Sequence, residues 1–288
     1  MVAAILLCLA AAALNAAWNA LLKTSGDPMA VATRAMSTSA LAVTPLVAIA
    51  WLLAGRPAVS PHTFALAGAS SVAEFIYFLG LTTAYQRGEL SVVYPLARGS
   101  APLLAVIAGV VVLGESLTVH LLAGVLLLVA GILIVRTPSR ASWPVMAPAL
   151  LTGAAIATYS AIDKVGTQQA PPWLYGWFLW CGGAVLLLAW AGIMRLRHMQ
   201  VPPASVPAAT AAPSGRVAVT IGAMMLISYL MVLFALRLAP LVVVAPLRES
   251  GIVLVTVVGA WRLGERAGLR PRIGGSLAIL GGVLILAF

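Results

Sequence analysis

The chain has 288 residues, of which 62% are hydrophobic and 8% charged, and its mean hydropathy is +1.07. This composition excludes a soluble globular domain and predicts a polytopic membrane protein. The formal net charge of +10 does not indicate a nucleic-acid partner. The arginines stand mostly in short connections between apolar segments, where they direct topology and meet anionic lipid head groups.

Charged, proline-rich and glycine-rich breaks divide the chain into apolar segments that can each cross about 30 Å of hydrocarbon as a helix. We predict an all-α fold of ten transmembrane helices, over residues 2–22, 29–54, 63–86, 90–113, 119–136, 144–163, 172–194, 217–237, 240–262 and 272–288. Most connections are very short, so consecutive helices should be antiparallel neighbours.

Two stretches of the sequence indicate an internal duplication. Residues 89–115 and 240–265 match at several positions that are rarely shared by chance, namely Arg98 with Arg248, Ser100 with Ser250, and Leu113-Gly114-Glu115 with Leu263-Gly264-Glu265. Ten helices in two copies leave five in each, and an odd number inverts the second copy in the membrane. The predicted domains are therefore a first five-helix repeat over 1–140 and a second, inverted repeat over 141–288.

Five ionisable side chains fall within the predicted helices, namely Arg34, Glu74, Arg98, Arg248 and Glu249. Each costs about 2.5–3.5 kcal/mol at the bilayer centre, so all should face protein or water. They either neutralise one another, as Glu74 would with Arg98, or bind a substrate. Three arginines against two glutamates leave one positive charge unmatched, which favours a carboxylate ligand with Arg98 as its anchor.

Helical spacing places polar and aromatic side chains beside these charges. They either form interhelical hydrogen bonds and ordinary packing or line a cavity. The candidate substrate-binding residues are Asn15, Trp18, Asn19, Arg34, Glu74, Tyr77, Tyr94, Arg98, Tyr159, Ser160, Arg248 and Glu249. Tyr159, Ser160 and Asp163 share one face of the sixth predicted helix, with the same two alternatives.

Three glutamates receive separate roles. Glu74 is the proton-coupling candidate, because a carboxyl in a poorly solvated site can exchange protons near neutral pH. Glu115 and Glu265 follow glycines that end helices, so we predict capping or loop roles for them.

The runs Asn15 to Lys23, Ala84 to Ser91, Tyr94 to Gly99, and the two Leu-Gly-Glu endings resemble EamA-type members of the drug/metabolite transporter superfamily. The resemblance implies two inverted five-helix repeats, with helices 1–4 and 6–9 around a central cavity and helices 5 and 10 at the periphery. It also implies a secondary transporter, commonly an exporter of amino acids or other small metabolites, that does not use ATP. Small multidrug relatives use a glutamate in the first helix, where this chain has Asn15 and Asn19.

The orientation of the chain is left open. Its loop arginines favour termini outside the cytoplasm, whereas the resemblance implies cytoplasmic termini.

We therefore predict a secondary active transporter that exports a small anionic or zwitterionic metabolite, of amino-acid or organic-acid type, by alternating access. The alternative is a proton-coupled cation or multidrug exporter that uses Glu74 and Glu249. The sequence contains neither a Walker phosphate loop nor a cluster suited to catalysis, so we expect no enzyme activity and no cofactor or metal. The expected setting is the cell (inner) membrane as a multi-pass protein, with the lipid bilayer and a small-molecule substrate as partners and a homodimer kept open.

Overall fold

The computed structural model describes residues 1–287 apart from 25–26, 88–89, 136–141, 200–214 and 252–268. The side chains of some helical residues, including Tyr94 and Arg98, are also outside the description. Every regular element in the described part is an α-helix: α1 (Val2–Thr24), α2 (Pro28–Leu53), α3 (Pro61–Arg87), α4 (Leu90–Val111), α5 (Val119–Val135), α6 (Trp143–Gln169), α7 (Pro172–Met199), α8 (Gly215–Leu238), α9 (Leu241–Arg248) and α11 (Leu269–Ala287).

Six of these helices, α1, α2, α3, α6, α7 and α8, are long and apolar enough to cross a membrane. The prediction of an all-α, polytopic membrane protein is thereby confirmed. Helices α6 and α7 are longer than predicted, because they continue beyond residues 163 and 194 to Gln169 and Met199. The regular helix α9 ends at Arg248, and most of the remainder of the helix predicted over 240–262 lies outside the described residues.

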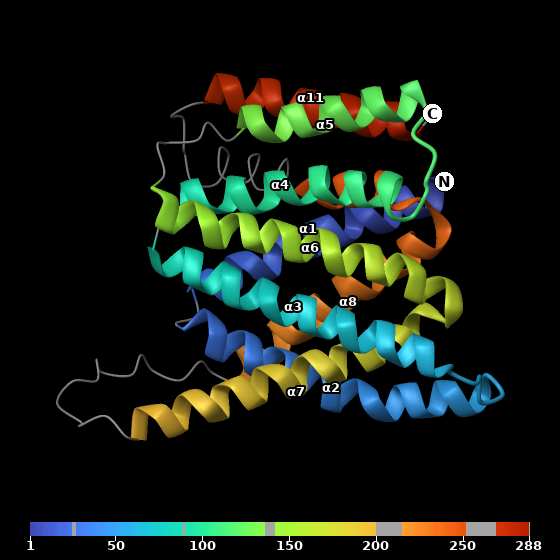
Figure 1. The fold of residues 1–288 in the computed structure, drawn as a ribbon, viewed down its shortest axis with the longest axis vertical. Coiled ribbons are helices and arrows are strands. Elements are labelled where there is room, and N and C mark those ends of the chain that lie inside the picture. Colours follow the sequence, from blue (N-terminus) through green and yellow to red (C-terminus); the bar gives the residue numbers. More distant parts are fainter. Residues whose placement is uncertain (25–26, 88–89, 136–141, 200–214, 252–268, 288) are drawn as a thin grey trace.

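The helices lie side by side in one bundle (Figure 1). Helices α5 and α11 pair at one edge, and α2 and α7 pair at the opposite edge. Between these edges, α1 packs against α8 and α9, while α6 packs against α3 and α4. A single hydrophobic cluster runs through most of the bundle, and its largest fully buried side chains include Trp180 and Tyr175.

Several threonine hydroxyls inside the helices are satisfied within the same helix. Thr33 Oγ1 donates to the Met29 carbonyl, and Thr82 Oγ1 donates to the Phe78 carbonyl, each over 2.8 Å. Because a threonine can donate to the carbonyl four residues earlier, it does not need water. These residues can therefore occupy apolar helices without an unsatisfied donor.

Helices α5 and α11 approach each other at two glycines. A Cβ atom on Gly131 would lie 2.6 Å from the Gly275 carbonyl oxygen, and one on Gly282 would lie 2.7 Å from the Gly124 carbonyl oxygen. Small residues at such contacts let helix backbones pack directly in a membrane. By contrast, a Cβ on Gly274 would meet nothing within 4 Å.

Replacing Gly131 by alanine tests this contact. Gly131→Ala should lower the melting temperature of the purified protein, because overpacking costs about 1–3 kcal/mol. The matched control is Gly274→Ala. Both substitutions raise helix propensity by about 1 kcal/mol, but the alanine Cβ at position 274 meets no neighbouring atom within 4 Å. Equal melting temperatures for the two variants would contradict the proposed close contact.

Candidate functional site

Helix α9 ends where Arg248 reaches the centre of the bundle. Pro246 has no N–H group to donate along the helix. The next backbone N–H groups form short-range bonds, from Glu249 to the Pro246 carbonyl at 3.0 Å and from Ser250 to the Leu247 carbonyl at 3.1 Å. This tightened turn ends the regular helix at Arg248.

Two tyrosines hold the Arg248 guanidinium. Its Nη2 atom donates to the Tyr159 hydroxyl over 2.7 Å. Its central carbon lies 5.5 Å from the centre of the Tyr159 ring and 5.7 Å from that of Tyr229. Cation–π contacts of this kind contribute up to about 2 kcal/mol where water is excluded. The cation is thereby stabilised in an apolar bundle by the aromatic residues of α6 and α8.

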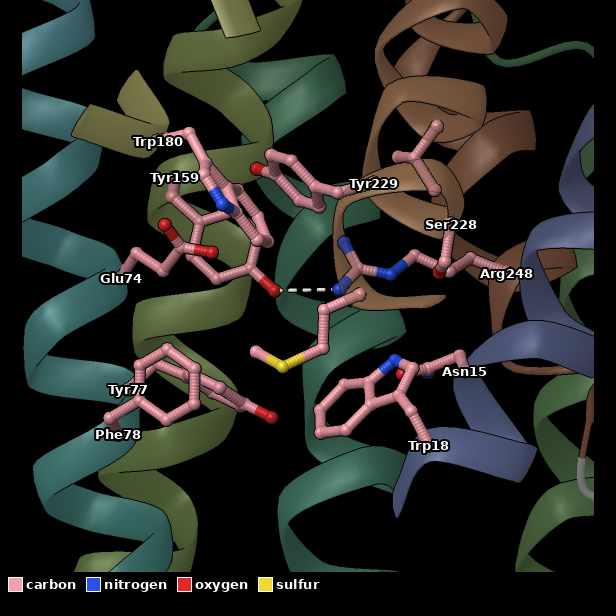
Figure 2. A pocket seen from close by; sticks show the side chains of 12 residues that line it. Asn15, Trp18, Glu74, Tyr77, Phe78, Tyr159, Trp180, Ser228, Tyr229 and Arg248 are labelled. Atoms are coloured by element: carbon pink, nitrogen blue, oxygen red, sulfur yellow. Dashed lines mark hydrogen bonds between the residues drawn. The ribbon is translucent and has the colours of Figure 1, made fainter. Parts of the chain in front are cut away.

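Glu74 on α3 lies on the opposite side of the same pocket, as Figure 2 shows. Its side chain is only 6% exposed. Its Oε2 atom is buried and has no hydrogen-bond partner among the described residues. A buried polar atom without a partner costs about 1–3 kcal/mol or more. A proton, a cation or a hydrogen-bond donor at this atom would therefore stabilise Glu74.

Asp163 on α6 is a third buried charge, and its importance was missed in the sequence. Its Oδ1 atom accepts hydrogen bonds from Ser70 Oγ at 2.6 Å and from the Tyr175 hydroxyl at 2.8 Å. Its Oδ2 atom accepts one from the Tyr229 hydroxyl. The spacing of Asp163 from Tyr159 was the available signal.

The charge count from the sequence was incomplete for this reason. Adding Asp163 to Glu74 and Glu249 gives three carboxylates against Arg34, Arg98 and Arg248. With three carboxylates and three arginines in this set, no positive charge is left unmatched.

Side chains from α1, α3, α6, α7, α8 and α9 enclose the pocket in Figure 2. The pocket is lined by Asn15, Trp18, Glu74, Tyr77, Phe78, Tyr159, Trp180, Met225, Ser228, Tyr229, Val232 and Arg248. Its free volume is about 30 Å³, and one water needs about 10–15 Å³ on this measure. The pocket in this conformation has room for about two waters, so any larger guest requires its walls to move.

The predicted substrate-binding residues fall into three groups. Those that line the pocket are Asn15, Trp18, Glu74, Tyr77, Tyr159 and Arg248. Asn19 lies one turn along α1, and its amide donates to the Asn15 carbonyl and side chain over 2.8 and 3.0 Å. Ser160 and Glu249 are buried outside the lining, Arg34 is exposed on α2, and the side chains of Tyr94 and Arg98 are outside the description.

The sequence analysis did not select several lining residues. These are Phe78, Trp180, Met225, Ser228, Tyr229 and Val232. Ser228 and Tyr229 were recognisable as polar side chains within an apolar segment. Trp180 and Met225 gave no signal, because such residues are equally common on packed and lipid-facing surfaces.

Helices α6 and α8 cap each other at their C-terminal ends. Lys164 Nζ donates to the carbonyls of Leu236 and Ala239 at 2.7 and 2.9 Å. In return, Arg237 Nη1 on α8 donates to the carbonyls of Thr167 and Ala170 at 2.6 and 3.0 Å. Cations suit helix C-termini because the last carbonyls are otherwise unpaired. Lys164 was predicted to follow a helix that ended at residue 163, and it is instead part of α6.

Glu115 caps a helix that is distant in sequence. Its Oε1 and Oε2 atoms accept hydrogen bonds from the backbone N–H groups of Leu241 and Val242 at 2.7 and 2.9 Å. A carboxylate is favoured there because the first N–H groups of a helix carry partial positive charge. The capping role predicted for Glu115 is confirmed, with α9 as the helix it caps. Glu265 lies outside the described residues.

Comparison with known proteins gives a family match for part of the chain and a similar fold for nearly all of it. The sequence model of the EamA-like transporter family matches residues 2–137. A solved crystal structure aligns with a TM-score of 0.70 and 18% identity over 98% of this chain and 95% of the other. At that identity the likeness concerns the fold alone. No curated protein matches the chain.

Removing the Lys164 amine tests the mutual capping of α6 and α8. Lys164→Ala should lower the melting temperature, because hydrogen bonds to a charged donor contribute about 1.5–3 kcal/mol each. Arg195→Ala, at an exposed position on α7, is the control and should stay within about 0.5 kcal/mol of the wild type. An unchanged melting temperature for Lys164→Ala would show that these bonds contribute little.

Proposed function

We propose, because residues 2–137 match the model of the EamA-like transporter family, that the chain is a secondary active transporter of a small zwitterionic metabolite. Within the range of substrates expected from the sequence, a zwitterion of amino-acid type is favoured over a simple anion. Export is the proposed direction, on the resemblance noted in the sequence. The proposed location of this multi-pass membrane protein is the cell (inner) membrane.

The observation that carries the proposal is the pair of opposite charges across one aromatic pocket. Arg248 can donate two hydrogen bonds to a carboxylate, and Arg is the residue best suited to that geometry. Glu74 offers its unpartnered Oε2 atom to an ammonium group. Because Asp163 is near enough to Arg248 to interact electrostatically, a ligand of net charge zero matches the site better than an anion.

Alternating access is supported by the way the helices pair. Exchanging each helix of α1–α5 with its counterpart in α6–α11 converts the contact of α1 with α8 into that of α6 with α3. The same exchange converts the contact of α1 with α9 into that of α6 with α4. We therefore retain the proposal of two inverted repeats, 1–140 and 141–288, that move against each other around a shared site.

The two ends of the bundle differ in a way that fits such movement. Helices α6 and α8 are in contact and cap each other, whereas their counterparts α1 and α3 share no comparable interface over their described residues. A bundle closed at one end and looser at the other is expected of one state of an alternating-access cycle.

Glu74 remains the proposed proton-coupling residue. A carboxyl without a hydrogen-bond donor in a nearly dry pocket is stabilised by taking up a proton, and an ammonium group can compete for the same place. Such competition would couple substrate movement to a proton gradient.

A second candidate is the cation or multidrug exporter. It is supported by the same Glu74 and by six aromatic side chains in the lining, which suit cations through their ring faces. Glu249, its other expected residue, is buried outside the lining.

A ligand screen tests the substrate class. Purified protein should gain thermal stability with some of the twenty standard L-amino acids and gain less with their desamino acids and decarboxylated amines, because a bound ligand stabilises the folded state. Greater stabilisation by lipophilic cations such as tetraphenylphosphonium would favour the second candidate.

Replacing Glu74 tests coupling. Glu74→Gln in liposomes should retain exchange of labelled substrate but lose uphill transport driven by a pH gradient, because glutamine cannot take up a proton. Glu249→Gln, outside the lining, serves as the control. Uphill transport by the Glu74 variant at the wild-type rate would remove Glu74 from the mechanism.

The role of Arg98 is tested alongside that of Arg248. Arg98→Lys and Arg248→Lys should each raise the KM for the substrate, by about tenfold for loss of bidentate geometry. Full transport by the folded Arg98 variant would assign the carboxylate to Arg248 alone.

A further inference from the structure

We propose that Asp163 is a positioning residue for substrate binding, which acts through Tyr229 to hold the Arg248 guanidinium where a carboxylate can reach it. This inference rests on the proposed function. Asp163 itself is outside the pocket lining, so it has no contact with the guest in this arrangement.

The position of Asp163 is fixed from several sides. It is fully buried, and its hydrogen-bond donors come from three different helices, with Ser70 on α3, Tyr175 on α7 and Tyr229 on α8. An ionised carboxylate can accept all three hydrogen bonds. The charged groups that act on it electrostatically are Glu74 and Arg248. Asp163 is therefore a well-anchored acceptor.

Tyr229 connects this anchor to the pocket. Its hydroxyl donates to Asp163, while its ring lies beneath the guanidinium of Arg248. A phenol that donates to a carboxylate becomes more electron-rich, and a more electron-rich ring attracts a cation more strongly. The negative charge of Asp163 thereby contributes to the binding of Arg248 through the ring between them.

Tyr159 contacts both Tyr229 and Arg248. Its ring meets that of Tyr229 edge to face, with centres 5.9 Å apart. Its hydroxyl accepts the hydrogen bond from Arg248. The guanidinium therefore lies beside both rings, at 5.5 and 5.7 Å from their centres, and the hydrogen bond to Asp163 fixes the Tyr229 ring. Loss of the Asp163 bond would leave the Tyr229 hydroxyl without its acceptor and let the ring turn, which would displace Arg248.

Variants of two tyrosines distinguish the positioning role of Asp163 from a purely structural role. Tyr175 and Tyr229 both donate to Asp163, yet only Tyr229 lines the pocket. Replacing either by phenylalanine removes one hydroxyl from the same carboxylate. If Asp163 only holds helices together, the two variants should behave alike.

The experiment measures dissociation constants on the purified full-length chain by calorimetry, with the standard L-amino acids as probes. Tyr229→Phe and Asp163→Asn should each weaken binding by about tenfold, whereas Tyr175→Phe should stay within about twofold of wild type. The double variant Asp163→Asn with Tyr229→Phe should bind about as weakly as either single variant, because each substitution disrupts the same hydrogen bond between Tyr229 and Asp163. Asp163→Glu should recover part of the affinity.

A second readout does not need a substrate. Phenylglyoxal modifies accessible arginines, and mass spectrometry of the peptide containing Arg248 reports its rate of modification. That rate should change in the Tyr229→Phe and Asp163→Asn proteins and stay at the wild-type value in the Tyr175→Phe protein.

Each outcome decides one question. Equal affinities and equal modification rates for the two tyrosine variants would overturn the role of Asp163. Absence of amino-acid binding to the wild type would overturn the proposed substrate class, and the modification rates would then decide the positioning role alone. If Asp163→Asn does not fold, the comparison of the two phenylalanine variants remains sufficient.

Discussion

Arg248 must be stabilised inside an apolar bundle, and much of the site is arranged around that requirement. A cation removed from water is tolerated in a membrane only when nearby groups replace its hydration. Here the rings of Tyr159 and Tyr229 cover the guanidinium, a hydroxyl accepts from it, and the carboxylates of Glu74 and Asp163 act on it electrostatically. These groups come from α3, α6 and α8, so the same requirement also brings distant helices together.

Contacts on both sides of Arg248 fix the backbone of the helix that carries it. Helix α9 is only eight residues long. The turn after it brings Gly251 close to α1, and a Cβ atom on Gly251 would lie 2.6 Å from the Ala12 carbonyl oxygen. A side chain at that position would separate α9 from α1. The start of α9 is fixed independently by Glu115. The helix that carries the cation is thus held at both ends by residues outside it.

Some of the residues that line this pocket could be selected from the sequence, because ionisable residues are rare in apolar segments. Glu74 and Arg248 stood out for that reason, and spacing then led to Asn15, Trp18, Tyr77 and Tyr159. Asp163 was undervalued because the predicted helix ended at that residue, beside Lys164, which resembled a membrane edge. The helix continues because the carbonyls of α8 accept hydrogen bonds from the Lys164 amine. Such a long-range contact leaves no local pattern, and the same is true of the packing that selects Trp180 and Met225.

The mutual capping of α6 and α8 limits how the C-terminal ends of these two helices can separate. Each helix supplies the cation that satisfies the final carbonyls of the other, through Lys164 in one direction and Arg237 in the other. If either terminus unravels, the last carbonyl groups of the other helix lose their hydrogen-bond donor. Partial separation would therefore leave unpaired carbonyl groups on both helices. Parting these two helices should therefore be an all-or-none event, with few half-open intermediates through which ions could leak.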